Sequence, residues 1–253
     1  MKRSILIFLI FCFAIPLSHS QLWKMRKWEA VAGAGPSFLF GDIGGFRRTE
    51  NLLGIRDLSY LQTRYNINAN IKYRTSRTSN LRLSLTYGQL HGTDERGSNE
   101  GRPFEVSTSI FEPALIGEYY FIKNRAESSY LFVKRRGRFI WTMLKSLDFY
   151  GFAGIGGVSY NVTPNEAQSE EMAKYDMQDS GFDFAIPVGV GATLVYTPNI
   201  NFGIELGGRY VFSDWIDGYH KEQYSKANDV YYFLNFTVTY KLKTGPHGLP
   251  SFR

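Results

Sequence analysis

The histidines are the first residues to consider for chemistry, because imidazole is a common general base beside a nucleophile. His91 stands near the start of one long polar connection, and His220 lies in another, shortly after Ser213 and Asp214. A serine, a histidine and a carboxylate held together near one rim could modify membrane lipids. An Asp, Gly, Tyr and His within one loop is also ordinary turn chemistry. We therefore expect that the chain is not an enzyme, and we keep a lipid-modifying enzyme as the last of three alternatives.

Metal and cofactor chemistry have equally little support. Asp214, Asp217 and Asp229 are close in sequence, but they lack the alternate-residue spacing of a calcium loop. Cys12 is the single cysteine and lies in an apolar N-terminal run. Once that run is removed, the chain has no disulfide, no thiolate nucleophile and no cysteine metal site. We expect no metal and no cofactor.

Residues 1–20 have the features of a cleaved secretory signal peptide. Lys2 and Arg3 precede an apolar run, and Ser18-His19-Ser20 places small residues where a signal peptidase acts. The run is shorter than the roughly 20 residues that span a bilayer. The mature chain, residues 21–253, then carries a net charge of +4 in place of +6. This mild excess on an exported protein argues against nucleic acid as a partner.

Alternation of apolar and polar residues dominates the chain after Trp28 and predicts β-strands. In residues 65–74, tyrosine, isoleucine and alanine alternate with three asparagines, a lysine and an arginine. A soluble core would not accept the polar face, whereas lipid on one side and a polar lumen on the other fit both faces. Eight segments qualify as strands, although Gly and Ala leave the facing of the first and fifth open: 28–40, 65–74, 81–90, 106–121, 147–160, 182–196, 202–212 and 231–242.

An even number of strands closes into an antiparallel barrel whose two ends lie on the same side. Closure pairs every strand edge, which a membrane demands because an unpaired backbone group in hydrocarbon costs several kcal/mol. The predicted fold class is all-β, an eight-stranded antiparallel transmembrane barrel in the lipid of a bacterial outer membrane. Both termini of the mature chain are expected in the periplasm.

A barrel of eight strands is just wide enough for its own side chains, which argues against a solute channel. Eight ionisable residues fall on the inner faces of the predicted strands. We expect them to pair across the interior and maintain the fold: Lys72, Arg74, Arg82, Glu112, Glu118, Asp183, Glu205 and Arg209.

The connections alternate in length, with short turns at 75–80 and 197–201 that we place on the periplasmic side. The connection 122–146 breaks this alternation, because it is long and basic where a short periplasmic turn is expected. It contains Lys134, Arg135, Arg136 and Arg138. Two interpretations stay open. These cations bind a protein partner, or the segment is an amphipathic excursion along the membrane surface.

Short motifs in the predicted barrel resemble PorG-like outer-membrane proteins of Bacteroidota. They include Phe40-Gly41-Asp42-Ile43-Gly44-Gly45 after the first strand and Ser213-Asp214-Trp215-Ile216-Asp217 after the seventh. Between them, Asn161-Val162-Thr163-Pro164 and Ile186-Pro187-Val188-Gly189 follow in the same order and spacing. The resemblance extends over nearly the whole mature chain and marks Gly41, Asp42, Gly44, Asp214 and Asp217 as family-motif residues.

The resemblance implies a component of the type IX protein secretion system, associated with a periplasmic ring of PorK-like and PorN-like proteins. The first function expected from it is a non-enzymatic barrel that anchors or scaffolds this ring. A free-standing surface barrel for adhesion or membrane integrity is the second alternative, ahead of the lipid-modifying enzyme.

Overall fold

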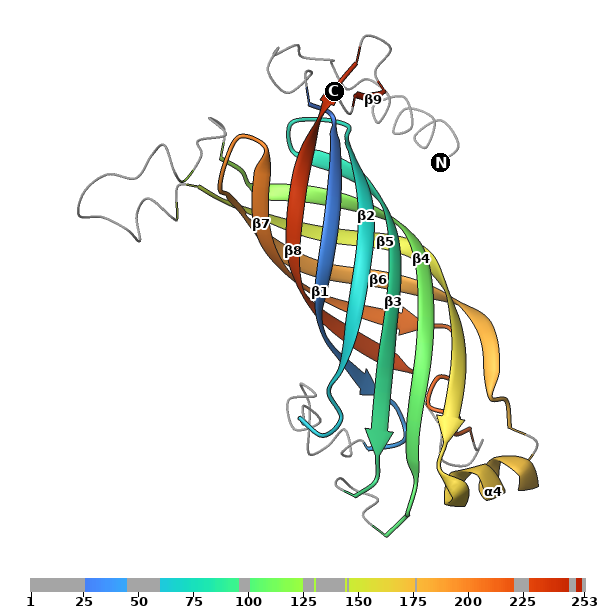
Figure 1. Cartoon of the computed structure of the whole chain (residues 1–253). Helices are drawn as coiled ribbons and strands as arrows, with labels where there is room; N and C mark the ends of the chain where they lie inside the picture. The colour runs from blue at the N-terminus through green and yellow to red at the C-terminus, as the bar shows by residue number, and fades with distance from the viewer. Residues whose placement is uncertain are drawn as a thin grey trace, which may run out of the picture.

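The computed structural model describes residues 26–44, 60–95, 101–124, 130, 144, 146–175, 177–220, 228–245 and 249–251. Most of them belong to one sheet (Figure 1). Its long strands are β1 Trp28–Phe40, β2 Arg64–Arg74, β3 Ser79–Thr93, β4 Glu105–Ile122, β5 Leu147–Pro164, β6 Ser180–Val195, β7 Ile200–Val211 and β8 Val230–Thr244.

Each strand pairs antiparallel with the next one in the chain, and β1 also pairs with β8. The closing register runs from Trp28 opposite Leu242 to Phe40 opposite Val230. The predicted closed, eight-stranded antiparallel barrel is therefore confirmed. The ninth strand, β9 Pro250–Ser251, makes a short antiparallel pair with the last residues of β8.

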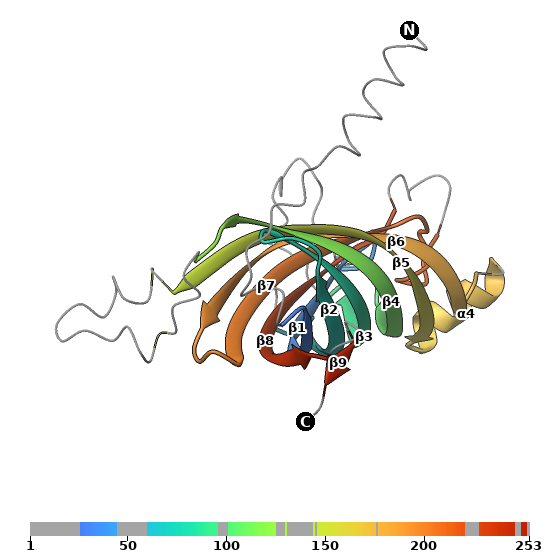
Figure 2. The same cartoon turned by 90° about the horizontal axis from the view of Figure 1, so that it is seen from above.

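The two ends of the barrel differ in their connections. The turn end carries the short connections 75–78 and 196–199, the start of β1 and the end of β8. The loop end carries the longer connections and α4 Glu166–Lys174, which follows β5 at the opposite end from β9 (Figures 1 and 2). The side chain of Asn165 begins α4 by accepting the N–H of Gln168 at 3.0 Å. Among the described residues, no helix combines the length and the hydropathy that crossing a bilayer requires.

The predicted signal peptide, residues 1–20, lies outside the described residues, as do Lys134, Arg135, Arg136 and Arg138. The described parts of their connection show that it leaves β4 after Ile122 and enters β5 at Leu147. Both of these strand ends lie at the turn end of the barrel (Figure 1).

The outward face of the barrel is a band of large apolar side chains. In β2, Ile67 and Ile71 are each 52% exposed, while the asparagines between them are buried. The same alternation places exposed residues on the other strands: Leu81, Leu83, Leu85, Phe111, Leu115, Phe182, Phe184, Val188, Val190, Phe202, Ile204, Leu206, Phe236 and Val238. Tyrosines such as Tyr65, Tyr119 and Tyr240 stand toward the ends of this face. Such an outer face suits hydrocarbon flanked by interfacial aromatics.

Candidate functional site

The interior of the barrel holds two different fillings, one toward each end. Toward the turn end, the side chains of Lys72 from β2, Arg82 from β3, Glu118 from β4 and Glu205 from β7 meet in the lumen. We call these four residues the lumen charge network. Each is 6% exposed or less, so the network is removed from water on all sides.

Short contacts connect the four charges of the network. Lys72 Nζ lies 2.8 Å from Glu118 Oε1. Arg82 Nη1 donates to both carboxylate oxygens of Glu205, at 2.7 and 2.9 Å, and lies 3.2 Å from Glu118 Oε1. The hydroxyl of Tyr150 in β5 also donates to Glu205. Two cations and two carboxylates thus neutralise one another at the centre of the barrel.

Two further interior pairs lie above and below this network along the strands. Arg209 Nε in β7 lies 3.4 Å from Glu112 Oε2 in β4, and Tyr231 donates its hydroxyl to the same carboxylate. Arg74 Nη2 donates to Glu29 Oε1 at 3.2 Å. Sequence reasoning missed Glu29, because the Gly- and Ala-rich strand β1 leaves its facing open.

Asp183 does not join any of these pairs among the described residues, and its pairing with a charge across the interior stays a prediction. It lies half-buried near the loop end of β6, beside Tyr160, and the described residues give it no ion pair. The physical reason is that apolar side chains, and not cations, fill the interior at this height.

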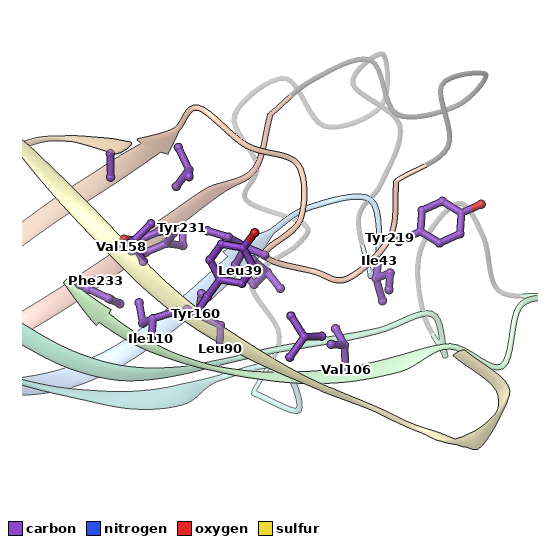
Figure 3. Packing of buried hydrophobic residues seen from close by; sticks show 14 residues of the cluster. Leu39, Ile43, Leu90, Val106, Ile110, Val158, Tyr160, Tyr219, Tyr231 and Phe233 are labelled. Carbon is purple, nitrogen blue, oxygen red and sulfur yellow. The ribbon is translucent and has the colours of Figure 1, made fainter. Parts of the chain in front are cut away.

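This apolar filling forms the second half of the interior and is shown in Figure 3. We call it the loop-end plug. Its fully buried members include Leu90, Val158, Val211 and Phe233 from four strands, together with Ile216 from the connection after β7. Ile43 and Tyr219 extend the plug into the loops themselves. These side chains are almost completely buried, so they fill the loop-end half of the lumen.

The family-motif residues meet above the plug. Asp217 Oδ2 accepts the backbone N–H of Asp42 at 2.6 Å and of Ile43 at 3.2 Å, and its Oδ1 accepts the N–H of Tyr219 at 2.9 Å. Asp229 Oδ2 accepts the N–H of Ile216 at 2.9 Å and of Asp217 at 3.3 Å. Two motifs that are far apart in sequence, after β1 and after β7, are therefore fastened to each other.

Glycine is needed at two positions of the first motif. A Cβ on Gly41 would lie 2.6 Å from Asp217 Oδ2 and 2.8 Å from Asp229 Oδ1. Gly44 has φ +80°, a left-handed conformation that favours glycine. Its N–H donates to Asp94 Oδ1 at 2.8 Å, and its carbonyl accepts from Gln62. The motif thus fixes the start of the loop after β1 over the plug.

The buried carboxyl groups of this cluster hold protons more tightly than free ones. Burial, followed by the charge of Asp42, raises the pKa of Asp217 to about 8. Burial and the nearby Asp217 raise the pKa of Asp229 well above its ordinary range. The Oδ1 atom of Asp229 has no hydrogen-bond partner among the described residues and faces the same point as Asp217 Oδ2. Burial thus favours the protonated form of both carboxyl groups. Within the described chain, no cluster of His, Cys, Asp or Glu could hold a metal ion.

The two histidines singled out in the sequence have different surroundings. His220 Nδ1 lies 2.8 Å from Asp214 Oδ2, and its ring packs 5.0 Å from that of Trp215, so it belongs to the motif loop after β7. His91 Nδ1 lies 3.0 Å from Ser107 Oγ, while its Nε2 lies 3.5 Å from Glu105 Oε1. His91 is thus within hydrogen-bond distance of a serine hydroxyl.

A small polar pocket opens at the turn end, below the lumen charge network. Lys123, Asp148 and Lys241 line it together with Glu29 and Arg74. Asp148 also accepts the N–H of Asn124 at 2.6 Å, which fastens the start of the basic connection beside the pocket. The roots of this connection are therefore built into the wall of the barrel.

A family model described as "Domain of unknown function (DUF6089)" matches residues 42–247. The comparison with curated proteins gives no match.

Similar solved structures include Neisserial surface protein A, at 12% identity and a TM-score of 0.46, covering 85% of this chain and 96% of that one. The N-terminal β-barrel domain of Pseudomonas aeruginosa OprF is 13% identical with a TM-score of 0.41, covering 86% and 98%. A major outer membrane protein from Thermus thermophilus is 12% identical with a TM-score of 0.43, covering 85% and 99%. Because these TM-scores are below 0.5, the assignment of the barrel fold rests on the strand pairing of this chain.

Proposed function

The chain belongs to the family described as a domain of unknown function (DUF6089), so its role has to be argued from the barrel, and we propose that it is an outer-membrane anchor. Specifically, it anchors or scaffolds the periplasmic ring of a type IX protein secretion system in Bacteroidota, in contact with PorK-like and PorN-like proteins. The anchoring itself requires no catalytic group, metal or cofactor.

The observation that carries this proposal is the filled lumen. The lumen charge network and the loop-end plug fill the middle and the loop end of the interior. A barrel sealed by its own side chains has to act through its surfaces, because it cannot conduct a solute. The apolar outward face is then the surface for outer-membrane lipid.

The turn end is the surface that we assign to the ring. Small outer-membrane barrels have their short turns in the periplasm and their long loops outside. With this orientation, the basic connection 122–146 and both ends of the mature chain are periplasmic. Asn124 and Asp148 fasten the start of that connection at the barrel wall, and the charge of its cations suits an acidic partner surface.

The experiment is a charge reversal in the full-length protein in its native cell. Lys134, Arg135, Arg136 and Arg138 are all changed to glutamate, and ring proteins are recovered with the barrel after detergent extraction. The control is Arg77→Glu, an exposed cation in the turn between β2 and β3 at the same end. Heat-modifiable gel mobility verifies the barrel in both variants, and export of type IX cargo is measured in parallel.

We expect the fourfold variant to lose ring proteins and cargo export while the barrel stays folded and the control retains both. Deletion of residues 125–143 should have the same effect. If a folded deletion variant still retains its partners and exports cargo normally, the anchoring proposal is wrong.

One observation favours the second candidate, a free-standing surface barrel for adhesion or membrane integrity. The loop end is highly organised, because Asp217 fastens two loops and Gln168 of α4 donates to the backbone carbonyl of Asp217 at 3.0 Å. In that case, variants of the exposed face of α4, such as Glu170→Ala with Lys174→Ala, would alter the phenotype while the basic connection would not.

A further inference from the structure

A serine, a histidine and a glutamate lie together on the outer wall of the barrel, away from the lumen and from the turn end. The ring of His91 stands between Ser107 Oγ, 3.0 Å from Nδ1, and Glu105 Oε1, 3.5 Å from Nε2. All three side chains come from the loop ends of two adjacent strands, β3 and β4.

The strand register brings these residues together. His91 is the direct antiparallel partner of Ser107, and Glu105 follows two residues before Ser107 on the same strand. Residues two apart on a strand share a face, and Leu81, Leu83, Leu85 and Tyr87 show that the odd-numbered residues of β3 face outward. The trio therefore faces the lipid side of the wall and not the lumen.

An activated nucleophile needs a base that the protein holds in place and a hydroxyl that a substrate can reach, and the exposed fractions of the three side chains fit this requirement. The side chain of His91 is 5% exposed, whereas that of Glu105 is 55% exposed and Ser107 is open to the surroundings. A carboxylate at Nε2 favours the tautomer with the proton on Nε2. Nδ1 is then an acceptor that can receive the hydroxyl proton of Ser107. The base is thus held in place by the protein while the nucleophile stays accessible.

The height of the trio on the barrel corresponds to the edge of the apolar band. Going from the centre toward the loop end, the outward pairs between β3 and β4 are Leu83 with Leu115, Leu85 with Pro113, Tyr87 with Phe111, Gln89 with Ser109, and His91 with Ser107. His91 lies four residues beyond Tyr87 in the chain, which is about 13 Å along a strand. The surface therefore changes from apolar through aromatic to polar just below the trio, which is the depth of lipid head groups and acyl esters. Arg64, one of the charged residues whose field acts on the His91 ring, adds a cation suited to a lipid phosphate.

We infer that Ser107, His91 and Glu105 form an acyl-ester hydrolase site for membrane lipids in the leaflet at the loop end. This activity goes beyond the anchoring role and revises the expectation that the chain is not an enzyme. Ser107 Oγ attacks the ester carbonyl of an acyl chain, and His91 takes the hydroxyl proton. The ester C–O bond breaks, and the same proton goes to the departing lipid alcohol. Water, deprotonated by His91, then attacks the acyl-serine. The acyl C–Oγ bond breaks, His91 returns the proton to Ser107 Oγ, and a free fatty acid leaves.

The test uses the full-length mature barrel in two assays. The first is covalent labelling with a fluorophosphonate, followed by mass spectrometry of the peptide that contains Ser107. The second is release of fatty acid from vesicles of phosphatidylethanolamine and phosphatidylglycerol that contain the inserted protein. The variants are Ser107→Ala, His91→Gln and Glu105→Gln.

Ser109→Ala is the matched control, because Ser109 lies on the same strand and the same face, one pair closer to the apolar band, and opposes Gln89. We expect an adduct on Ser107 and acyl release that falls at least about 100-fold in Ser107→Ala and His91→Gln. Glu105→Gln should reduce the rate about 10-fold, because Glu105 orients the ring without touching the ester. Ser109→Ala should leave both readouts unchanged.

The inference is overturned if the wild-type barrel gives neither an adduct on Ser107 nor fatty acid, since labelling of the wild type needs no variant to fold. It is equally overturned if acyl release persists in Ser107→Ala, because the activity then comes from another protein. In either case, the anchoring proposal is unaffected, because it depends on the basic connection at the other end of the barrel.

Discussion

The two halves of the lumen solve the same packing problem with different chemistry. Toward the turn end, the balanced charges of the lumen charge network lie beside a small buried cluster that includes Tyr150 and Phe152. Toward the loop end, residues such as Leu90 and Phe233 fill it with apolar side chains, under a cover of fastened loops. In both halves, the closed sheet buries side chains that point inward. The free energy lost when such a side chain is changed depends on whether it is charged or apolar.

Breaking the lumen charge network should have the largest effect on stability. Arg82→Met removes the two hydrogen bonds to Glu205 and the contact to Glu118, and it leaves two buried carboxylates with one lysine. We expect a loss of about 3–5 kcal/mol in the free energy of unfolding, since an uncompensated buried charge is costly. Urea unfolding in lipid vesicles, followed by tryptophan fluorescence, measures it.

Two companion variants sharpen this result. Arg77→Met changes an exposed arginine in the turn between β2 and β3 and should stay within about 0.5 kcal/mol of the wild type. Arg82→Met combined with Glu205→Gln removes one charge of each sign and should recover part of the loss. A loss below about 1 kcal/mol for Arg82→Met alone would mean that water enters this half of the lumen.

Releasing the loops over the other half should have a smaller and local effect. Asp217→Ala leaves the N–H groups of Asp42, Ile43 and Tyr219 without their acceptor. We expect the free energy of local opening to fall by about 2 kcal/mol, the cost typical of buried groups left unpaired, while the strands keep their stability. Hydrogen exchange of residues 42–44 and 216–219 measures the opening.

The control for this variant is Asp179→Ala. Asp179 is an exposed aspartate in the connection after α4, and its side chain accepts a hydrogen bond from the neighbouring Ser180 hydroxyl. Its exchange should match the wild type. If Asp217→Ala instead unfolds the whole barrel, the loop-end plug and its cover form one cooperative unit with the strands.

The same contrast explains how far the sequence predicted this molecule. The strands followed from period-two alternation, since lipid on one face and a polar lumen on the other fix the side of each residue in segments such as 65–74. Glu29 was missed, because Gly and Ala give β1 no polar and apolar faces to compare. Asp183 was placed on the correct face, but alternation carries no information on height, so its position beside Tyr160 near the loop end was not foreseen.

Contacts between strands were the least predictable. His91 and Ser107 are 16 residues apart, and they meet only because one register between β3 and β4 is formed. A shift of two residues would keep every face correct and would separate the pair. The contact of Asp217 with Asp42 spans 175 residues and depends on closure of the whole barrel. The motif residues could be named from the sequence, but their meeting point could not.

The smallest expected effect is a pH dependence of stability at the loop end of the barrel. Folding raises the pKa of Asp217 to about 8 from an unfolded value of 3.8, and burial also raises that of Asp229. The folded loop end therefore binds more protons than the open one, so its stability is complete at low pH and is lost as the pH rises toward 8. Between pH 7 and 8 we expect Asp217 alone to decrease the free energy of local opening by about 1 kcal/mol, measured by hydrogen exchange at residues 42–44.

Asp229→Asn tests the cause of this pH dependence. The amide keeps the shape of the carboxyl group but does not titrate, so it removes the contribution of Asp229 itself to the pH dependence. The variant should show a flatter dependence between pH 7 and 8 than the wild type. An unchanged slope would assign the effect to another group near the cluster, with Asp42, Asp94, Asp214 and His220 as the titratable side chains that face it.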